Sequence, residues 1–157
     1  LKMQLGCIFF IFVKILKMND IKLILSEHNI SNTKFRTDLL SLFYSSSRSL
    51  SVEDILNNYN SSINKVTIYR CLADFENKGL IHKVPDNNNL KRYALCNQNE
   101  CNSTSHSHNH GHFICYSCNQ TFCLDKMKVP DTSYIKGFYV KEIKLTAEGY
   151  CSDCYKN

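Results

Sequence analysis

The chain has 157 residues, nine cysteines, a hydrophobic content of 43% and a net charge of +5. This length fits one ordinary domain or two small domains, and the odd cysteine count without a secretory signal argues against a disulfide-bonded secreted protein. We therefore expect a cytoplasmic protein whose cysteines are reduced or bound to metal. The positive net charge is only weak evidence for nucleic-acid binding, because residues 18–86 carry eight Lys or Arg and eight Asp or Glu.

The first seventeen residues, LKMQLGCIFFIFVKILK, differ from the rest of the chain. Their apolar run, Leu5 to Val13, is far shorter than the roughly 20 residues that span a bilayer, so we expect no membrane partner. No small-residue cleavage site follows it, as a signal peptide would require. Met18 stands directly before a helical pattern. We expect residues 1–17 to be a spurious extension, and the alternative is an ordinary N-terminal helix.

Four successive segments after residue 17 carry apolar residues at helical spacing. They are residues 19–29, 32–46, 50–60 and 64–79. In the third segment, Ser51 and Asp54 predict a capping box at the start of the helix. Leu50 and Ile55 predict a hydrophobic staple across the same start. The fourth segment ends at Gly79, a residue suited to a left-handed C-terminal cap.

The fourth helix has two distinct faces. The face expected to pack inward holds Ile68, Cys71, Leu72 and Phe75. The face too polar and aromatic for a core holds Val66, Tyr69, Arg70 and Ala73. Two β-like runs, GLIHKV and NLKRYAL, follow and are separated by the turn-rich PDNNN. This order predicts a winged helix, in which one helix enters the major groove, and the alternative is a helical bundle with a trailing hairpin.

The C-terminal part begins with a polar stretch that reads as a hinge loop over residues 96–110. Two strands are expected beyond it, in HFICYSC and in YVKEIKLTAEGYC, and Pro130 limits any helix between them to a turn or two. Such a small one-sided sheet cannot bury its apolar face alone, so we expect a second copy of the chain to cover it. The expected fold class is α+β, with a DNA-binding domain at 18–95 and a small α/β dimerisation domain at 111–157.

Two Cys-x-x-Cys pairs, Cys115 with Cys118 and Cys151 with Cys154, predict a structural zinc site. Each spacing lets two sulfurs converge on one ion at about 2.3 Å, and four thiolates leave no ligand position for a substrate. The alternative is two disulfides or redox pairs.

Further candidate ligands bracket the junction between the two domains. They are His82, Cys96, His106, His108, His110, His112 and Cys123. Alternating histidines in an extended segment point every second imidazole to one side, so a pair can share an ion. A mixed set of nitrogen and sulfur ligands from His82, Cys96, His110 and His112 would suit zinc. The alternative is a solvated histidine loop.

The chain also resembles the ferric uptake regulator superfamily of metal-dependent repressors. The resemblance lies in TIYRCLADFENKGLI, HFICYSC, GYCSDC and the Thr33-x-x-Arg36 pattern. It implies a homodimer that binds inverted-repeat operators in double-stranded DNA, without catalysis. It further implies that Tyr69 contacts thymine methyl groups while Arg70 and Arg36 contact phosphates. Lys65 and Thr67, on the same helix, complete the candidate DNA-binding set.

The ligand pattern is similar to the zinc uptake regulators within this superfamily, which use a histidine in the first wing strand and a cysteine closing the second, where this chain has His82 and Cys96. Iron-sensing and peroxide-sensing members place a histidine and an acidic residue where this chain has Ser49 and Ala94. Cys123 stands where relatives carry a glutamate, and with His106 or His108 it forms a candidate second sensing site. We expect a zinc-dependent repressor with zinc in the structural site and zinc, or alternatively iron(II), in the regulatory site. The same residues are also compatible with a sensor of manganese or peroxide, or with a zinc storage or redox protein that does not bind DNA.

Overall fold

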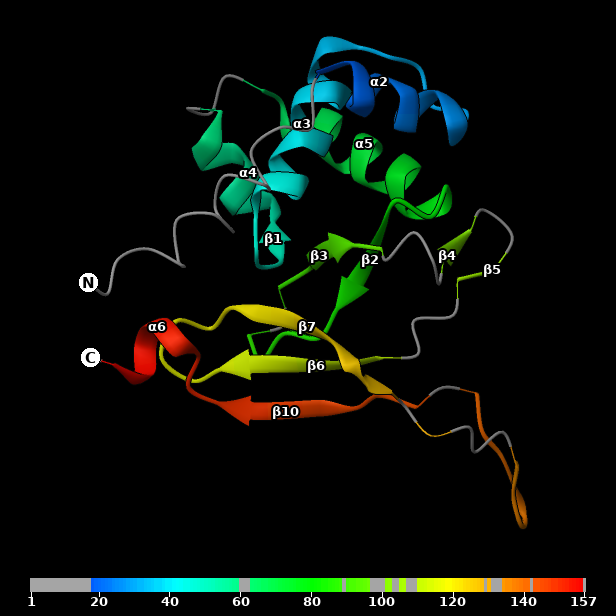
Figure 1. The fold of residues 1–157 in the computed structure, drawn as a ribbon, viewed down its shortest axis with the longest axis vertical. Helices are drawn as coiled ribbons and strands as arrows, with labels where there is room; N and C mark the ends of the chain where they lie inside the picture. The colour runs from blue at the N-terminus through cyan, green and yellow to red at the C-terminus, as the bar shows by residue number, and fades with distance from the viewer. Residues whose placement is uncertain are drawn as a thin grey trace, which may run out of the picture.

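The computed structural model describes residues 18–59, 63–88, 90–96, 101–102, 105–106, 110–128, 130, 134–141 and 143–156. Residues 1–17, expected to be a spurious extension, lie outside the described residues. The helices gather at one end of the molecule, a small sheet lies beneath them, and a second sheet forms the other end (Figure 1). None of the helices in the described part of the chain has the length and apolar character needed to cross a bilayer.

The four predicted helices are present. They are α2 (Met18–Glu27), α3 (Lys34–Ser45), α4 (Val52–Asn58) and α5 (Lys65–Asn77). The predicted capping box is confirmed, because Ser51 Oγ accepts from Asp54 N–H and the Asp54 carboxylate accepts from Ser51 N–H. Gly79 adopts the left-handed φ of 76° that the predicted helix end requires.

The apolar faces of the helices form one core. The expected inward face of α5 is confirmed, because Ile68, Cys71, Leu72 and Phe75 are all buried. They pack with buried residues of the other helices, among them Ile21, Leu25, Leu39, Leu40, Phe43 and Ile55. Burying each such side chain contributes about 1.5–3 kcal/mol. This core fixes α5 on the body and turns its other face outward.

The first sheet completes a winged helix. Its strands are β1 (Leu50–Ser51), β2 (Ile81–Val84) and β3 (Arg92–Leu95), in the order β1-β3-β2 and antiparallel. The strands β2 and β3 correspond to the predicted hairpin. The strand β1 was not expected, since two residues directly before a helix cap carry no strand pattern of their own.

The second sheet contains β6 (His110–Cys115), β7 (Thr121–Lys128) and β10 (Thr146–Gly149) in the order β10-β6-β7. The strand β10 runs parallel to β6, whereas β7 pairs antiparallel with it. The strand β7 was not predicted. Of the described residues in the expected strand over 139–151, those of β10 take strand pairing in this sheet. A short helix, α6 (Ser152–Tyr155), follows β10.

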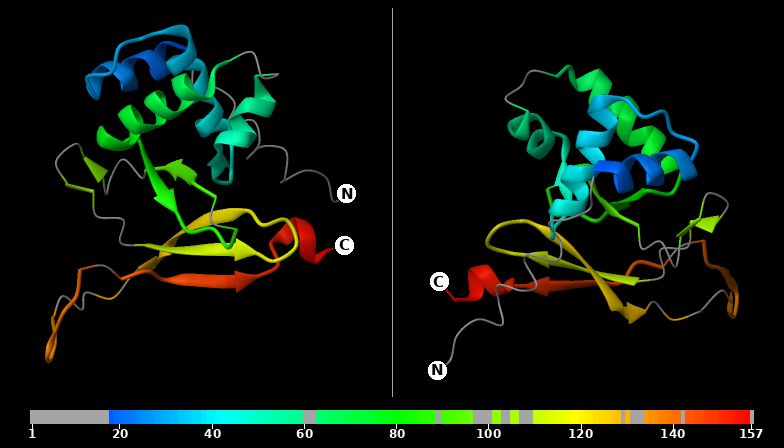
Figure 2. Two further views of the ribbon diagram at one scale, coloured as in Figure 1. Left: turned by 180° about the vertical axis from the view of Figure 1, so that it is seen from behind. Right: turned by 45° about the horizontal axis from the view of Figure 1, so that its top comes forward.

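Two small hairpins lie outside these sheets. The strands β4 (Cys101–Asn102) and β5 (Ser105–His106) pair within the stretch expected to be a loop. The strands β8 (Tyr134–Ile135) and β9 (Phe138–Tyr139) form a hairpin that projects away from the body (Figure 2). Phe138 and Tyr139 at its end are 71% and 87% exposed.

Polar contacts join the second sheet to the winged helix. Ser49 N–H donates to Thr121 O at 3.0 Å, and Thr121 Oγ1 donates to Pro85 O at 2.8 Å. Arg92 Nη1 donates to Gln120 Oε1 at 3.2 Å. Gln120 and Thr121 lie where β7 begins, so the start of this strand is a main point of attachment between the two parts.

Candidate metal centres and DNA-contacting helix

Four cysteine sulfurs meet at one end of the second sheet. Because β10 is parallel to β6 and Gly149 pairs with Cys115, both strands end at the same edge. Cys115 ends β6 and Cys118 lies in the turn after it, while Cys151 and Cys154 lie at the start of α6. The four sulfurs lie within 4.8 Å of one another, with Cys118 Sγ and Cys151 Sγ 3.9 Å apart. We call this group the four-sulfur cluster.

Backbone N–H groups favour the thiolate of Cys115, whereas burial raises the pKa of the Cys118 thiol to about 12. The N–H groups of Cys118 and Cys151 donate to Cys115 Sγ and lower the pKa of its thiol to about 6. Asn119 has a φ of 53°, which turns the chain back so that Cys115 N–H donates to Gln120 O at 3.0 Å. A zinc–sulfur bond of about 2.3 Å gives a tetrahedral edge of about 3.8 Å, close to the 3.9 Å found. The four sulfurs therefore fit a structural zinc ion.

A second group of donors joins the wing to the second sheet. His82 comes from β2, His110 and His112 from β6, and Cys123 from β7, and their donor atoms lie within 4.8 Å of one another. The alternation of β6 puts His110 and His112 on one side, and Cys123 is paired across from His112. The three histidines are buried. We call this group the mixed cluster.

The spacing in the mixed cluster suits a tetrahedral ion. His82 Nε2 lies 3.4 Å from His112 Nε2 and 3.6 Å from Cys123 Sγ. Zinc bonds of about 2.0–2.1 Å to nitrogen and about 2.3 Å to sulfur give tetrahedral edges of about 3.4 and about 3.6 Å. Burial, followed by the nearby Asp125 carboxylate, raises the pKa of the Cys123 thiol to about 12. An ion that binds Cys123 therefore has to displace a proton.

The mixed cluster differs from the expected grouping. Cys96 is not part of it among the described residues, and its sulfur instead lies 3.7 Å from the opposite ring nitrogen, Nδ1, of His82. Cys123, expected in a second site, takes the fourth position. The backbone of His106 lies in β5, and His108 lies outside the described residues. The register of β7 is what places Cys123 beside His112. The sequence did not predict this strand and therefore could not predict that position.

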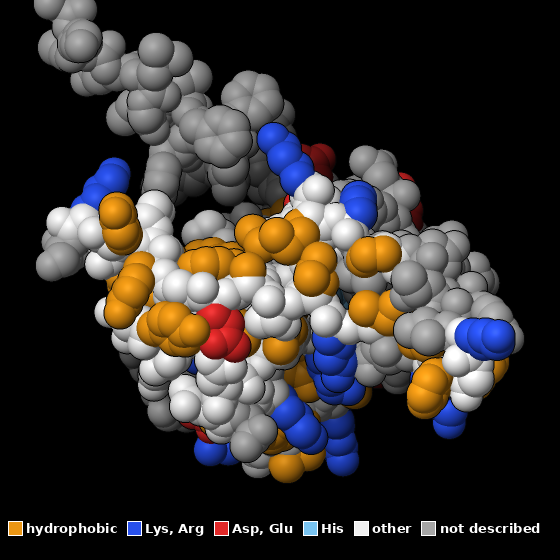
Figure 3. All heavy atoms as spheres, turned by 90° about the horizontal axis from the view of Figure 1, so that it is seen from below, with side chains coloured by type: hydrophobic (Ala, Val, Ile, Leu, Met, Phe, Trp, Pro, Cys, Tyr) orange, Lys and Arg blue, Asp and Glu red, His pale blue; other side chains and the backbone are white. Residues whose placement is uncertain are grey.

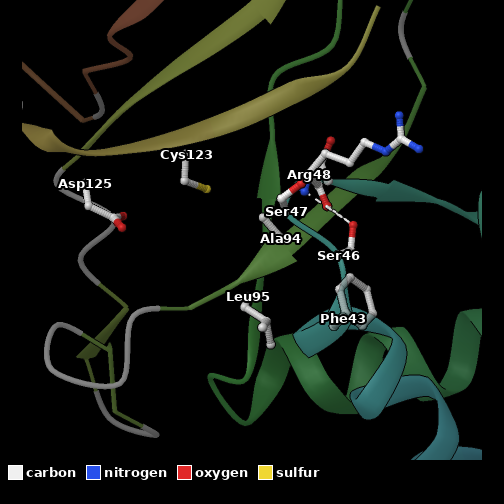
Figure 4. Close-up of a pocket in the computed structure, with 9 residues that line it drawn as sticks. Phe43, Ser46, Ser47, Arg48, Ala94, Leu95, Cys123 and Asp125 are labelled. Atoms are coloured by element: carbon white, nitrogen blue, oxygen red, sulfur yellow. Dashed lines mark hydrogen bonds between the residues drawn. The ribbon is translucent and has the colours of Figure 1, made fainter. Parts of the chain in front are cut away.

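A cavity of about 210 Å³ opens beside the mixed cluster, with the Cys123 sulfur and the Asp125 carboxylate pointing into it (Figure 4). Ser49 and Ala94 line the cavity with small side chains. The Ser49 hydroxyl is buried without a hydrogen-bond partner among the described residues. Cys123 is therefore a member of the mixed cluster that borders an open cavity.

The outward face of α5 presents the expected DNA-contacting side chains. Lys65, Thr67, Tyr69 and Arg70 are all exposed, with Tyr69 at 46%. Arg36 lies differently, because its guanidinium donates to the side chains of Ser31 and Asp74 and is mostly buried. Arg36 is thus placed to hold α3 against α5, whereas the other four side chains face solvent.

Comparison with known proteins finds relatives of one kind. The sequence model of the ferric uptake regulator family matches residues 27–147. A ferric uptake regulation protein of Synechococcus elongatus is 30% identical over 147 residues, covering 88% of this chain and 95% of the relative. Another, from Staphylococcus aureus, is 25% identical over 140 residues, covering 87% of this chain and 96% of the relative.

Solved structures share the fold. A zinc uptake regulator complexed with zinc and DNA superposes with a TM-score of 0.61 at 21% identity, covering 88% of this chain and 93% of that one. The ferric uptake regulator of Helicobacter pylori, described as having three functional metal binding sites, gives a TM-score of 0.55 at 17% identity. It covers 90% of this chain and 95% of its own.

Proposed function

Because the chain belongs to the ferric uptake regulator family, we propose that it is a zinc-responsive transcriptional repressor. Membership makes the protein a metal-responsive DNA-binding regulator and not an enzyme. In our proposal it acts in the cytoplasm, as a homodimer on inverted-repeat operators in double-stranded DNA. Zinc fills the four-sulfur cluster permanently and the mixed cluster when it is abundant.

The observation that carries this function is the placement of the mixed cluster. His82 belongs to the wing that follows α5, whereas His110, His112 and Cys123 belong to the second sheet. An ion held by all four side chains therefore limits how the winged helix can lie relative to that sheet. A ligand that binds one arrangement more tightly shifts the population toward it, by the difference in binding free energy. DNA affinity rises with zinc if that arrangement is the one that fits the operator.

The donor types support zinc over harder cations. Three imidazoles and one thiolate make a soft, four-coordinate set at tetrahedral spacing. Manganese and iron(II) sites more often recruit carboxylate oxygens and higher coordination numbers. Asp125 lines the cavity next to Cys123 with a carboxylate, but it is not among the four clustered donors, and Ser49 and Ala94 of the winged helix add no carboxylate.

Our proposed DNA-binding surface lies on the winged helix, and our proposed dimer surface lies on the second sheet. The exposed face of α5, with Tyr69 and Arg70, is our proposed major-groove surface. Hydrophobic side chains also gather on the side of the molecule away from the helices (Figure 3). Tyr116, Ile143 and Tyr150 of the second sheet region are exposed in the single chain. We propose that a second copy covers this surface, which would set two α5 helices on successive turns of DNA.

Capture of genomic fragments by the purified protein tests this function directly. The four-sulfur cluster is kept filled, and capture is compared with added zinc, with anaerobic iron(II) and with a chelator too weak to empty that cluster. We expect the wild-type protein to capture a few fragments, and only in the zinc condition. We expect Cys123→Ser and Tyr69→Ala to capture none. Selective capture with iron(II) would overturn zinc as the signal. Equal capture in all three conditions would show that the mixed cluster is not a sensor.

A further inference from the structure

The pairing of β6 with β7 is irregular between His110 and Gly111. These two residues are neighbours on β6, but their partners on β7 are Lys128 and Leu124. The strand β7 therefore carries extra residues, 125–127, at this point, which makes a β-bulge. The bulge separates His110 from the other two members of the mixed cluster that the second sheet supplies.

Met127, the last residue of the bulge, lies against Gly111. A Cβ atom at position 111 would lie 2.8 Å from Met127 Sδ, 3.1 Å from its Cγ and 3.3 Å from its Cβ. Real Cβ atoms essentially never have a neighbour closer than 3.0 Å. The end of the methionine side chain can turn away, but its Cβ moves only together with the backbone of β7. A side chain at position 111 would therefore displace the bulge.

Space, and not backbone conformation, restricts position 111. The φ of Gly111 lies outside the left-handed region, so alanine could adopt the same backbone conformation. Gly111 is buried. Because side chains alternate along β6, Met127 contacts the face of the sheet opposite to the imidazoles of His110 and His112. The methionine therefore does not compete for an ion held by these imidazoles.

We propose that Gly111 is a positioning residue for the sensing ion. Because it has no side chain, Met127 can lie across β6, and this contact holds the bulge that sets His110 relative to His112 and Cys123. A metal site needs its donors within about 0.5 Å of their binding positions. A displaced bulge would move donors on both strands at once. The inference rests on the proposed sensing function of the mixed cluster.

Cobalt(II) binding measures this positioning. With zinc in the four-sulfur cluster, cobalt(II) is titrated into the mixed cluster, and its absorption reports the affinity and the tetrahedral geometry of the donors. We expect Gly111→Ala to bind cobalt about 10–100-fold more weakly, the usual effect of disturbing the surroundings of a metal site. It should keep the zinc of the four-sulfur cluster. In a Met127→Ala background, which removes the two closest contacts, adding Gly111→Ala should weaken cobalt binding clearly less.

Gly149→Ala is the matched control. It adds the same methyl group to the same sheet, where the nearest atoms belong to the Phe113 ring at 3.5 and 3.6 Å, an ordinary contact distance. Its cobalt affinity should equal that of the wild type.

Three results would overturn the inference. The first is wild-type cobalt affinity in Gly111→Ala, and the second is an equal loss with and without the Met127 side chain. The third is loss of zinc from the four-sulfur cluster in Gly111→Ala, because the whole sheet would then need this glycine. If the wild-type protein takes up no cobalt beyond the four-sulfur cluster, the proposed sensing function itself fails.

Discussion

Replacing Arg92 with methionine would break a buried charge network that ties the winged helix to the second sheet. The Arg92 side chain is 7% exposed and donates through Nε to Asp86 Oδ2 at 2.7 Å. Its Nη1 donates to Asp54 Oδ2 at 3.0 Å and to Gln120 Oε1 at 3.2 Å. Three separate elements, the wing loop, the start of α4 and the start of β7, therefore converge on one guanidinium.

The expected loss of stability follows from the burial of the partners. Removing one member of a buried ion pair costs about 3–5 kcal/mol, because the other charge stays buried and uncompensated. The Asp86 side chain is 2% exposed, so it falls in that class, whereas Asp54 at 35% adds little. Backbone N–H groups of Asn88 and Leu90 still reach Asp86, which places the expected cost at the lower end, about 3 kcal/mol.

Urea unfolding followed by helical circular dichroism measures this loss. A denaturant slope of about 1–3 kcal/mol per molar converts it to a midpoint lower by at least about 1 M. The matched control is Lys34→Met, which breaks the Lys34–Asp38 pair, whose lysine is 91% exposed, and should cost less than about 0.5 kcal/mol. Equal costs for the two variants would refute the role of Arg92. The double variant Asp86→Asn with Arg92→Met should recover part of the loss, since it leaves no buried charge at this pair.

The same network predicts that the free energy of unfolding decreases at acid pH. Burial alone would raise the pKa of the Asp86 carboxyl, but hydrogen bonds from Leu90 N–H, the Arg92 guanidinium and Asn88 N–H together hold it below its ordinary value of 3.8. A carboxyl with a lowered folded-state pKa stabilises the protein above its unfolded-state pKa. This contribution should disappear as the pH falls below about 4. The urea midpoint of the wild type should therefore decrease in this pH range, and Asp86→Asn should lack that part of the decrease.

Tyr69→Ala should remove most of the affinity for specific DNA, as measured by fluorescence anisotropy. Urea unfolding should give a free energy of unfolding within about 0.5 kcal/mol of the wild type, because the Tyr69 side chain is exposed. Ser51→Ala should cost about 1 kcal/mol through the lost cap, whereas Ser49→Ala should be neutral or stabilising, since its buried hydroxyl has no partner among the described residues. Cys118→Ser should lose the zinc of the four-sulfur cluster and disorder the second sheet, whereas Cys123→Ser should retain one zinc by metal analysis.

The helices could be predicted from the sequence because their signals are local. The capping box at Ser51, the glycine at the end of α5 and the stripe of buried residues on that helix all lie within a few residues of the structure they specify. The four-sulfur pattern is local in the same sense, since each spacing brings two sulfurs together within one turn. These features need no knowledge of the partner strand.

The remaining part of the site depends on strand pairing over long distances. The strand β7 is a mixed polar and apolar run without clear alternation, so its own residues do not predict strand pairing. Without β7, nothing in the sequence places Cys123 across from His112. The order of residues likewise does not determine which nitrogen of His82 faces Cys96, because that is decided by the rotation of one ring about its own bond.

Both candidate metal clusters depend on the hairpin of β6 and β7. Under the proposed function, this shared dependence would let the four-sulfur cluster support the mixed cluster as a sensor. Cys115 and Cys118 close the turn of this hairpin, and the same register that follows from the turn brings Cys123 opposite His112. Gln120 and Thr121, just after the turn, contact the wing through Arg92 and Pro85. A metal in the four-sulfur cluster therefore stabilises the geometry of three donors and the attachment that brings the fourth, His82, within reach. In our proposal, the sensing ion then completes an arrangement that a metal in the four-sulfur cluster has already made favourable.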